Sequence, residues 1–178
     1  LKNMEQNPQT PESSQLPILI VDKKGMIGDA LQKKFREQFL TVYVTASVAE
    51  HHDNVIAVSW RKRLPTVPDN MYSHIFVVYN GEKELLDMLP GFVKKARESK
   101  GKVIFITSLL FSSIKLLAYL QHASFQDIKI VIFGETFGPQ STEVNEMNFL
   151  LDQVRSYGRI ELSNAGLSKL YPILIDDV

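Results

Sequence analysis

The stretch Ile18-Leu-Ile-Val-Asp-Lys-Lys-Gly-Met-Ile-Gly28 decides the fold, because an apolar strand runs directly into a glycine-containing turn that opens an amphipathic helix. A dinucleotide-binding fingerprint has this order, with spaced glycines for the tight turn, the approach of the pyrophosphate and the packing of helix on strand. Gly25 and Gly28 fill the second and third glycine positions, whereas Asp22 stands at the first. A carboxylate there would lie near the anion that a helix N-terminus attracts. The stretch therefore predicts a nucleotide-binding shape with an altered phosphate site.

Apolar segments alternate with helical or loop segments along the rest of the chain. Helical periodicity predicts helices near 26–38, 82–99, 112–124 and 142–157, with a break or bend at Pro90 because proline lacks the amide that its turn needs. In the third helix we expect Ile114, Leu117, Ala118 and Leu120 on the buried side. The predicted strands are Ile18–Val21, Thr41–Thr45, Val55–Ser59, His74–Tyr79, Lys102–Thr107 and Ile128–Phe133. This order predicts an α/β protein: a three-layer Rossmann-like fold with a mostly parallel sheet flanked by helices.

The length of 178 residues fits one domain. Residues 1–15 are polar and lack apolar periodicity, so we expect a flexible N-terminal arm or linker there. Residues 16–178 form the Rossmann-like domain, and we expect it to continue beyond residue 178 in a longer protein. The chain has no cysteine, which excludes disulfides, a thiolate nucleophile and a thiolate metal site. The four histidines show no metal-ligand spacing, so we expect no metal.

Charge and hydropathy exclude further classes of function. Twenty basic residues balance twenty acidic residues, so no net field recruits nucleic acid or an anionic membrane. No apolar run approaches the ~20 residues that span a bilayer, and the N-terminus has no secretory pattern. We therefore expect no nucleic-acid partner, no membrane insertion by this segment and a cytoplasmic location.

Four characteristic sequence segments follow one another after residue 15. They are the strand and turn Ile18–Gly28, the strand Val103–Ser108, the segment Ile130–Pro139 with its Gly-Glu-Thr-Phe-Gly-Pro ending, and the terminal run Tyr171–Val178. In this order they resemble the extended short-chain dehydrogenase/reductase family, in its nucleotide-sugar epimerase/dehydratase branch. The likeness covers nearly the whole chain after residue 15.

The resemblance implies NAD or NADP as the cofactor and a nucleotide-sugar as the ligand. Gly138-Pro139 would line the nicotinamide side, and Asp176-Asp177 would begin the elements that complete the sugar-nucleotide pocket. The cofactor-binding residues that it implies are Asp22, Gly25, Met26, Ile27, Gly28, Thr45, Thr107, Gly138 and Pro139. Family enzymes use an acidic or a basic residue after the second strand to choose between the two cofactors. Here Thr45 and its neighbours supply hydroxyls without charge.

The catalytic pattern of the family carries over only in part. Its members exchange a proton through a tyrosine, with a lysine four residues later and a serine or threonine after the fifth strand. The matching positions are Phe111, Lys115 and either Ser108 or Thr107. A phenyl ring cannot exchange a proton, so Ser108 and Lys115 are vestigial in this alignment. Tyr79 and Tyr119 are the substitutes to consider.

Three hypotheses follow for function. The first is a degenerate, non-catalytic domain, a pseudoenzyme, with a regulatory, sensory or interaction role in a longer protein. The second is an active NAD(P)-dependent nucleotide-sugar epimerase/dehydratase or reductase with an atypical site. The third is a response-regulator receiver, because Ile18–Asp22 is similar to its first strand and acidic pocket, although neither the third nor the fourth strand ends in aspartate. We prefer the first hypothesis.

Two segments have more than one interpretation as binding surfaces. Helix 112–124 carries leucines that could form a homodimer or dock an intramolecular partner domain, or could pack only on the sheet. The cluster Arg61–Arg63 is either a solvated loop or a site for a phosphate or an acidic partner, and Lys23 and Lys24 could also attract phosphate.

Overall fold

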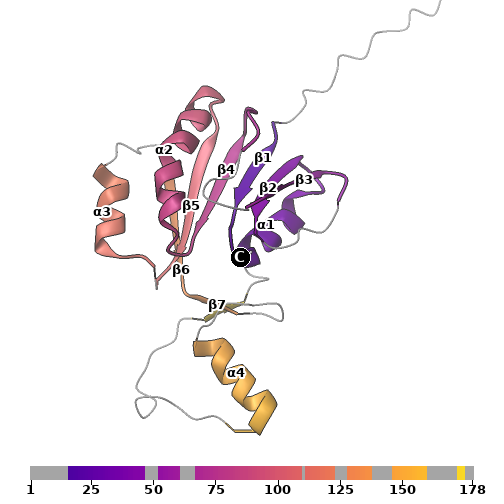
Figure 1. The fold of residues 1–178 in the computed structure, drawn as a ribbon, viewed down its shortest axis with the longest axis vertical. Coiled ribbons are helices and arrows are strands. Elements are labelled where there is room, and N and C mark those ends of the chain that lie inside the picture. The colour runs from indigo at the N-terminus through magenta and orange to yellow at the C-terminus, as the bar shows by residue number, and fades with distance from the viewer. Residues whose placement is uncertain are drawn as a thin grey trace, which may run out of the picture.

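A parallel six-stranded sheet organises the molecule in the computed structural model, which describes residues 16–46, 52–60, 67–109, 111–122, 128–137, 146–159 and 172–174. The strands are β1 (Ile18–Val21), β2 (Thr41–Thr45), β3 (Val55–Ser59), β4 (His74–Tyr79), β5 (Lys102–Ser108) and β6 (Ile128–Phe133). The helices are α1 (Met26–Phe35), α2 (Lys83–Glu98), α3 (Ile114–His122) and α4 (Glu146–Tyr157). Figure 1 shows their arrangement.

The strand order is β3-β2-β1-β4-β5-β6, with every neighbouring pair parallel. This is the order of a dinucleotide-binding Rossmann sheet, and it confirms the predicted α/β class. The order reverses between β1 and β4, so these two strands flank the point where open α/β sheets bind ligands. A receiver has the flavodoxin-like order 2-1-3-4-5 instead. The receiver hypothesis is therefore wrong.

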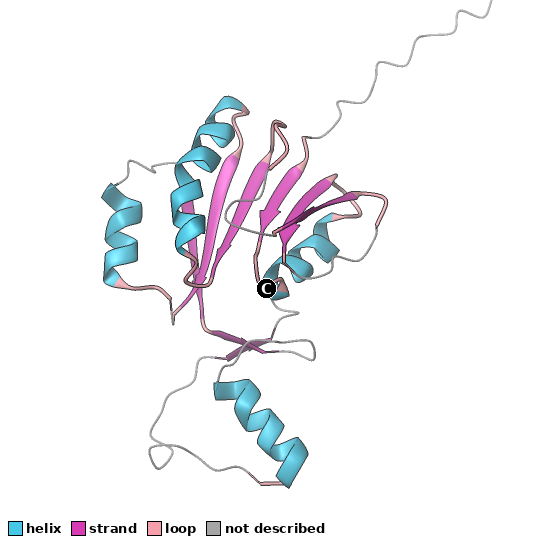
Figure 2. Ribbon diagram, viewed as in Figure 1, coloured by secondary structure: helices cyan, strands magenta, loops and turns pink. Residues whose placement is uncertain are grey.

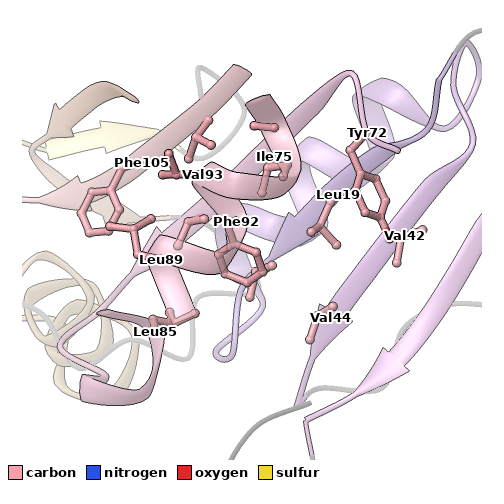
Figure 3. Packing of buried hydrophobic residues seen from close by; sticks show 14 of the residues in the cluster. Leu19, Val42, Val44, Tyr72, Ile75, Leu85, Leu89, Phe92, Val93 and Phe105 are labelled. Atoms are coloured by element: carbon pink, nitrogen blue, oxygen red, sulfur yellow. The ribbon is translucent and has the colours of Figure 1, made fainter. Parts of the chain in front are cut away.

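Helices cover both faces of the sheet and produce two apolar clusters (Figure 2). The larger cluster lies between α2 and the sheet, where Leu85, Leu89 and Phe92 meet alternate residues of the strands (Figure 3). The smaller cluster lies under α1, where Ile27 and Leu31 pack with residues of the opposite alternation. Every residue of β1 is buried, because this strand is covered on both faces. The core therefore centres on β1 and its neighbours.

Helix α2 runs as one element from Lys83 to Glu98 with Pro90 inside it, so of the two predicted alternatives, a break or a bend, the break is wrong. Pro90 is exposed and lies opposite the packed face. That face is held on both sides of the proline by residues at helical spacing: Leu85, Leu89, Phe92, Val93 and Ala96 are all buried. Burial of this stripe offsets the amide hydrogen bond that proline cannot make.

Helix α3 buries Leu116 and Leu120 in the larger cluster. Leu117 and Ala118 are half-buried, and Ile114 is 87% exposed, so the prediction that Ile114 faces the core is wrong. The helix begins at Ile114 because the hydroxyl of Ser113 accepts the amide of Leu116 at 3.1 Å. An N-terminal residue of so short a helix lies at the rim of the packed face rather than inside it.

A second, two-stranded parallel sheet joins β7 (Glu135–Phe137) to β8 (Pro172–Leu174). It lies beyond the end of the main sheet at which β6 finishes, with α4 next to it (Figure 1). The predicted start of this last helix, at 142, and the arm at 1–15 lie outside the described residues. Among the described helices, none combines the length and the apolar character needed to cross a bilayer.

Candidate functional site

Polar side chains gather at the carboxyl ends of the central strands, on both sides of the switch point. Asp22 follows β1, Thr45 ends β2, Asn80 follows β4, and Thr107 and Ser108 end β5. All five are buried although they are polar. Because neighbouring parallel strands end at one edge of a sheet, the structure brings the predicted residues Asp22, Thr45, Thr107 and Ser108 to the same edge, together with Asn80, which the sequence did not single out.

Asp22 closes the β1–α1 turn from the inside. Its Oδ1 accepts the amides of Lys24 at 3.1 Å and Gly25 at 3.0 Å, and its Oδ2 accepts the amide of Gly28 at 2.7 Å. The residue is 1% exposed. Amides at the start of a helix are the groups that bind phosphate in a dinucleotide fold. In this chain a carboxylate of the protein itself accepts them.

The two glycines of the turn serve different needs. Gly25 precedes α1 with φ of 101°, a left-handed conformation that side chains disfavour. Gly28 leaves no room for a side chain: a Cβ there would lie 2.7 Å from the Cβ of Asp22 and 2.7 Å from Cε2 of Tyr43. Met26 and Ile27 are buried, with Ile27 in the smaller apolar cluster. The space beside Gly28 is therefore filled by Asp22 and Tyr43.

Tyr43 is a residue of this site that the sequence did not single out. It lies in β2 and is 1% exposed. Its hydroxyl donates to Oδ1 of Asp29 at 2.6 Å, with the carbonyl oxygen of Gly25 as a second acceptor at 3.1 Å. Burial, with the nearby charge of Asp22, raises the pKa of Tyr43 far above its ordinary value. Tyr43 thus keeps its proton and connects β2 to the turn by hydrogen bonds. In the sequence, its place in a predicted strand was the only indication that it is buried.

Burial raises the pKa of Asp22 from 3.8 to about 6, and the charge of Glu82 adds to the rise. The three amide hydrogen bonds act in the opposite direction without cancelling it. The side chain of Glu82 accepts the amide of Asn80 at 2.8 Å, on the opposite side of the switch point. Two carboxyl groups therefore border the place where an anionic ligand would enter.

The lysines of the turn lie against aromatic rings. Nζ of Lys23 is 5.5 Å from the centroid of Trp60, a buried residue just after β3. Nζ of Lys24 is 5.3 Å from the centroid of Phe111. Contacts of this kind stabilise an ammonium group through the ring quadrupole. Lys23 and Lys24, the two lysines predicted to attract phosphate, thus each contact an aromatic ring.

Phe111 lies in the turn between β5 and α3. Its ring would lie 3.2 Å from a Cβ placed on Gly81, whose φ is 96°, and it makes an edge contact with Tyr79 at 6.5 Å between centroids. Lys115 is exposed on α3, which begins only at Ile114. Phe111 and Lys115 therefore do not share a helix.

Thr107 and Ser108, the candidate hydroxyl residues at the end of β5, both make hydrogen bonds that hold the backbone here, Thr107 through its hydroxyl and Ser108 through its backbone carbonyl. Oγ1 of Thr107 donates to the carbonyl oxygen of Tyr79 at 3.2 Å and so joins β5 to β4. The backbone carbonyl of Ser108 accepts the amides of Phe111 and Ser112, which makes the turn before α3 tight. Burial and the charge of Glu82 raise the pKa of Tyr79. A catalytic tyrosine needs a lowered pKa, so this environment works against Tyr79 as a substitute.

Several predicted site residues lie outside the described residues: Gly138, Pro139, Arg61–Arg63 and Asp176-Asp177. Within the described ranges, no group of histidine, aspartate and glutamate side chains has the arrangement of a metal site.

Comparison with protein-family models and with curated protein sequences gives no match. The arrangement of the site must therefore carry the functional argument. The residues of the turn do not fit a dinucleotide diphosphate, because Asp22 accepts the amides of Lys24, Gly25 and Gly28 and the space beside Gly28 is filled.

Proposed function

We propose that this chain is a non-catalytic, Rossmann-like domain of the extended short-chain dehydrogenase/reductase type, in which an interaction role has replaced dinucleotide-dependent chemistry. The observation that carries the proposal is the carboxylate of Asp22, which accepts three amides at the start of α1. The family assignment rests on the order of the four sequence segments at 18–28, 103–108, 130–139 and 171–178, and the Rossmann strand order supports it.

Electrostatics supports the loss of cofactor binding. At neutral pH the carboxyl group of Asp22 is ionised, since its pKa is about 6. A diphosphate approaching α1 would meet this negative charge, with the side chain of Glu82 close enough to raise the pKa of Asp22. Repulsion between buried or half-buried charges is screened far less than between exposed ones. Binding would also require an alternative acceptor for each amide that the carboxylate releases.

The missing proton donor supports the loss of turnover. A phenyl ring, Phe111, stands where the family pattern has its tyrosine, and it lies in the turn before α3, whereas Lys115 is exposed on α3 itself. Tyr79 lies near Phe111, yet its pKa is raised rather than lowered. Tyr79, the tyrosine beside Phe111, therefore lacks the lowered pKa that the reaction needs.

Calorimetric titration tests the proposal directly. We expect no heat of binding from the oxidised or reduced forms of NAD and NADP with the unaltered chain. Asp22→Gly removes the internal carboxylate, so it should create measurable affinity for these dinucleotides. Asp22→Asn is the matched control: it removes the charge but keeps a side chain in the turn, so it should stay without affinity. Circular dichroism establishes that each variant is folded.

Micromolar binding by the unaltered chain would reject the proposal and favour the active-enzyme hypothesis. In that case Phe111→Tyr becomes the informative variant, with hydride transfer followed by the absorbance of the reduced nicotinamide. Turnover gained through Phe111→Tyr would identify the proton donor as the missing component.

A further inference from the structure

The ring of Phe111 connects the three segments that surround the switch point of the main sheet. It comes from the turn between β5 and α3, and its centroid lies 5.3 Å from Nζ of Lys24 in the β1–α1 turn. In the segment between β4 and α2, Gly81 lies so close that a Cβ on it would be 3.2 Å from the ring. Tyr79, at the end of β4, meets the ring edge-on at 6.5 Å between centroids. One side chain therefore joins the segments that follow β1, β4 and β5.

Open α/β sheets bind their ligands between these segments, at the carboxyl ends of the strands on both sides of the switch point. Two polar residues of this edge lie beside the ring. Asn80 stands between Tyr79 and Gly81, and the carbonyl oxygen of Ser108 accepts the amide of Phe111 at 3.1 Å. Both residues are only 9% exposed. The contacts of the ring are therefore placed where they control access to the polar ends of β4 and β5.

We propose that Phe111 and Lys24 form an autoinhibitory latch at this edge of the sheet, and that a ligand reaches Asn80 and Ser108 only after the ring has moved away from the ammonium group. The name latch is used below for the contact between these two side chains. The proposal goes beyond the loss of dinucleotide binding, because it concerns the access of any ligand. It also stands apart from Asp22, whose carboxylate accepts the backbone amide of Lys24 and makes no contact with the latch through the lysine side chain.

The strength of the contacts suits a latch that opens and closes. Lys24 is exposed and Phe111 is half-buried, unlike the rings of the core. An ammonium group over a ring at an exposed site favours the closed arrangement by roughly two- to fivefold. Gly81 accommodates the ring, because it has φ of 96° and no side chain that would meet Phe111. The closed state is thus favoured without being permanent.

The neighbouring lysine provides a matched comparison within the same turn. Nζ of Lys23 lies 5.5 Å from the centroid of Trp60, which follows β3. Lys23 and Lys24 therefore make the same kind of contact with rings from different segments of the chain. Replacing Lys23 removes the same charge from the same turn and leaves the contact between Lys24 and Phe111 in place. An effect of Lys24 that Lys23 does not share is an effect of the latch.

Thiol labelling measures how often the latch opens. The chain has no cysteine, so Ser108→Cys introduces a single thiol of similar size at a buried position beside Phe111. Its reaction with iodoacetamide is followed by mass spectrometry, without any nucleotide. In this background Phe111→Ala should speed labelling by about tenfold, because the ring is gone. Lys24→Gln should speed it by roughly two- to fivefold, and Lys23→Gln should leave it unchanged.

Conservative variants separate the latch from a general loosening of the turn. Phe111→Tyr keeps the ring and Lys24→Arg keeps the cation, so both should label as slowly as the Ser108→Cys chain alone. Circular dichroism establishes that each variant is folded. A labelling rate that Phe111→Ala does not change, or an equal acceleration by Lys24→Gln and Lys23→Gln, would overturn the proposal.

Hydrogen exchange gives a second readout that needs no thiol, so the test stands even if Ser108→Cys does not fold. The amide of Asn80 donates to the side chain of Glu82 at 2.8 Å, so it exchanges with solvent when this segment opens. Mass spectrometry of a peptide that covers residues 79–83 should show faster exchange in Lys24→Gln than in Lys23→Gln. Equal exchange in these two variants would contradict the latch.

Discussion

β1 and β6 are both short, strongly apolar strands, yet the structure gives them opposite environments. β1 is buried at every residue, with α1 on one face and α2 on the other. β6 is exposed at four of its six residues. The difference teaches that apolar content predicts a strand but not its position in the sheet. Position depends on which segments supply the covering helices and the neighbouring strand.

The largest effect should separate the two strands directly. Ile20→Ala in β1 empties a site that is 0% exposed, so we expect a loss of about 3 kcal/mol in the free energy of unfolding. Ile130→Ala in β6 makes the same change at a residue that is 38% exposed and should cost about 1 kcal/mol or less. Urea unfolding at concentrations where the chain is monomeric measures both. Equal losses would remove the contrast between the strands.

The turn that follows β1 should respond to pH. Folding raises the pKa of Asp22 from 3.8 to about 6, so between these values the folded protein holds a proton that the unfolded chain has released. Stability from this group is therefore complete below pH 4 and is lost as the pH rises through 6. The loss amounts to about 3 kcal/mol for a rise of this size.

Asp22→Asn isolates that contribution, because asparagine does not titrate. The stability of the unaltered chain relative to this variant should fall between pH 4 and pH 6.5, whatever constant offset the substitution brings. Urea unfolding at several pH values measures the difference. A relative stability that rises with pH would mean that the amides lower the pKa of Asp22 below its ordinary value.

Packing within the same turn gives a smaller effect. Gly28→Ala would force a Cβ to within 2.7 Å of Asp22 and Tyr43, so we expect a loss of about 2 kcal/mol. Gly91→Ala is the control, because nothing lies within 4 Å of that position in α2. It should stabilise the protein by about 0.5 kcal/mol, since alanine is the better helix former. Thermal unfolding distinguishes the opposite signs.

The smallest effect concerns the start of α3, on the side of the molecule near β6. α1 is capped by Asp22 from within the core, whereas α3 is capped by the hydroxyl of Ser113. Ser113→Ala should cost about 1 kcal/mol. Ser112→Ala, whose hydroxyl bonds to Leu109 at the surface, should cost less. A thermal shift as large as that of Gly28→Ala would show that α3 contributes more to stability than its cap suggests.

Much of the fold could be predicted from the sequence. All six strands of the main sheet are confirmed, five of them with the predicted ends, because apolar runs bounded by polar or turn residues specify them. The two-stranded sheet of β7 and β8 could not be predicted, since three-residue strands carry too little pattern. The course of α2 through Pro90 depended on packing against the sheet, which periodicity around the proline does not reveal.

The site was predictable in its location but not in its arrangement. The sequence placed Asp22 at a glycine position and suggested repulsion of an anion. The side chain turns inward to accept the amides in a turn that Tyr43 also holds, through a hydroxyl that bonds to Gly25, 18 residues away in the chain. Pairings over such a distance follow from the register of β1 and β2, where Ile20 lies beside Tyr43. One sequence alone does not give that register.

Gly134 alone separates the last residue of β6 from the first residue of β7. A single residue has two soft torsions, so the direction in which the small sheet leaves the large one depends on the φ and ψ of this glycine. Glycine permits a wider range of these angles than any other residue. The connection between the two sheets is thus a single residue, and a substitution such as Gly134→Pro would restrict the φ angle at this junction.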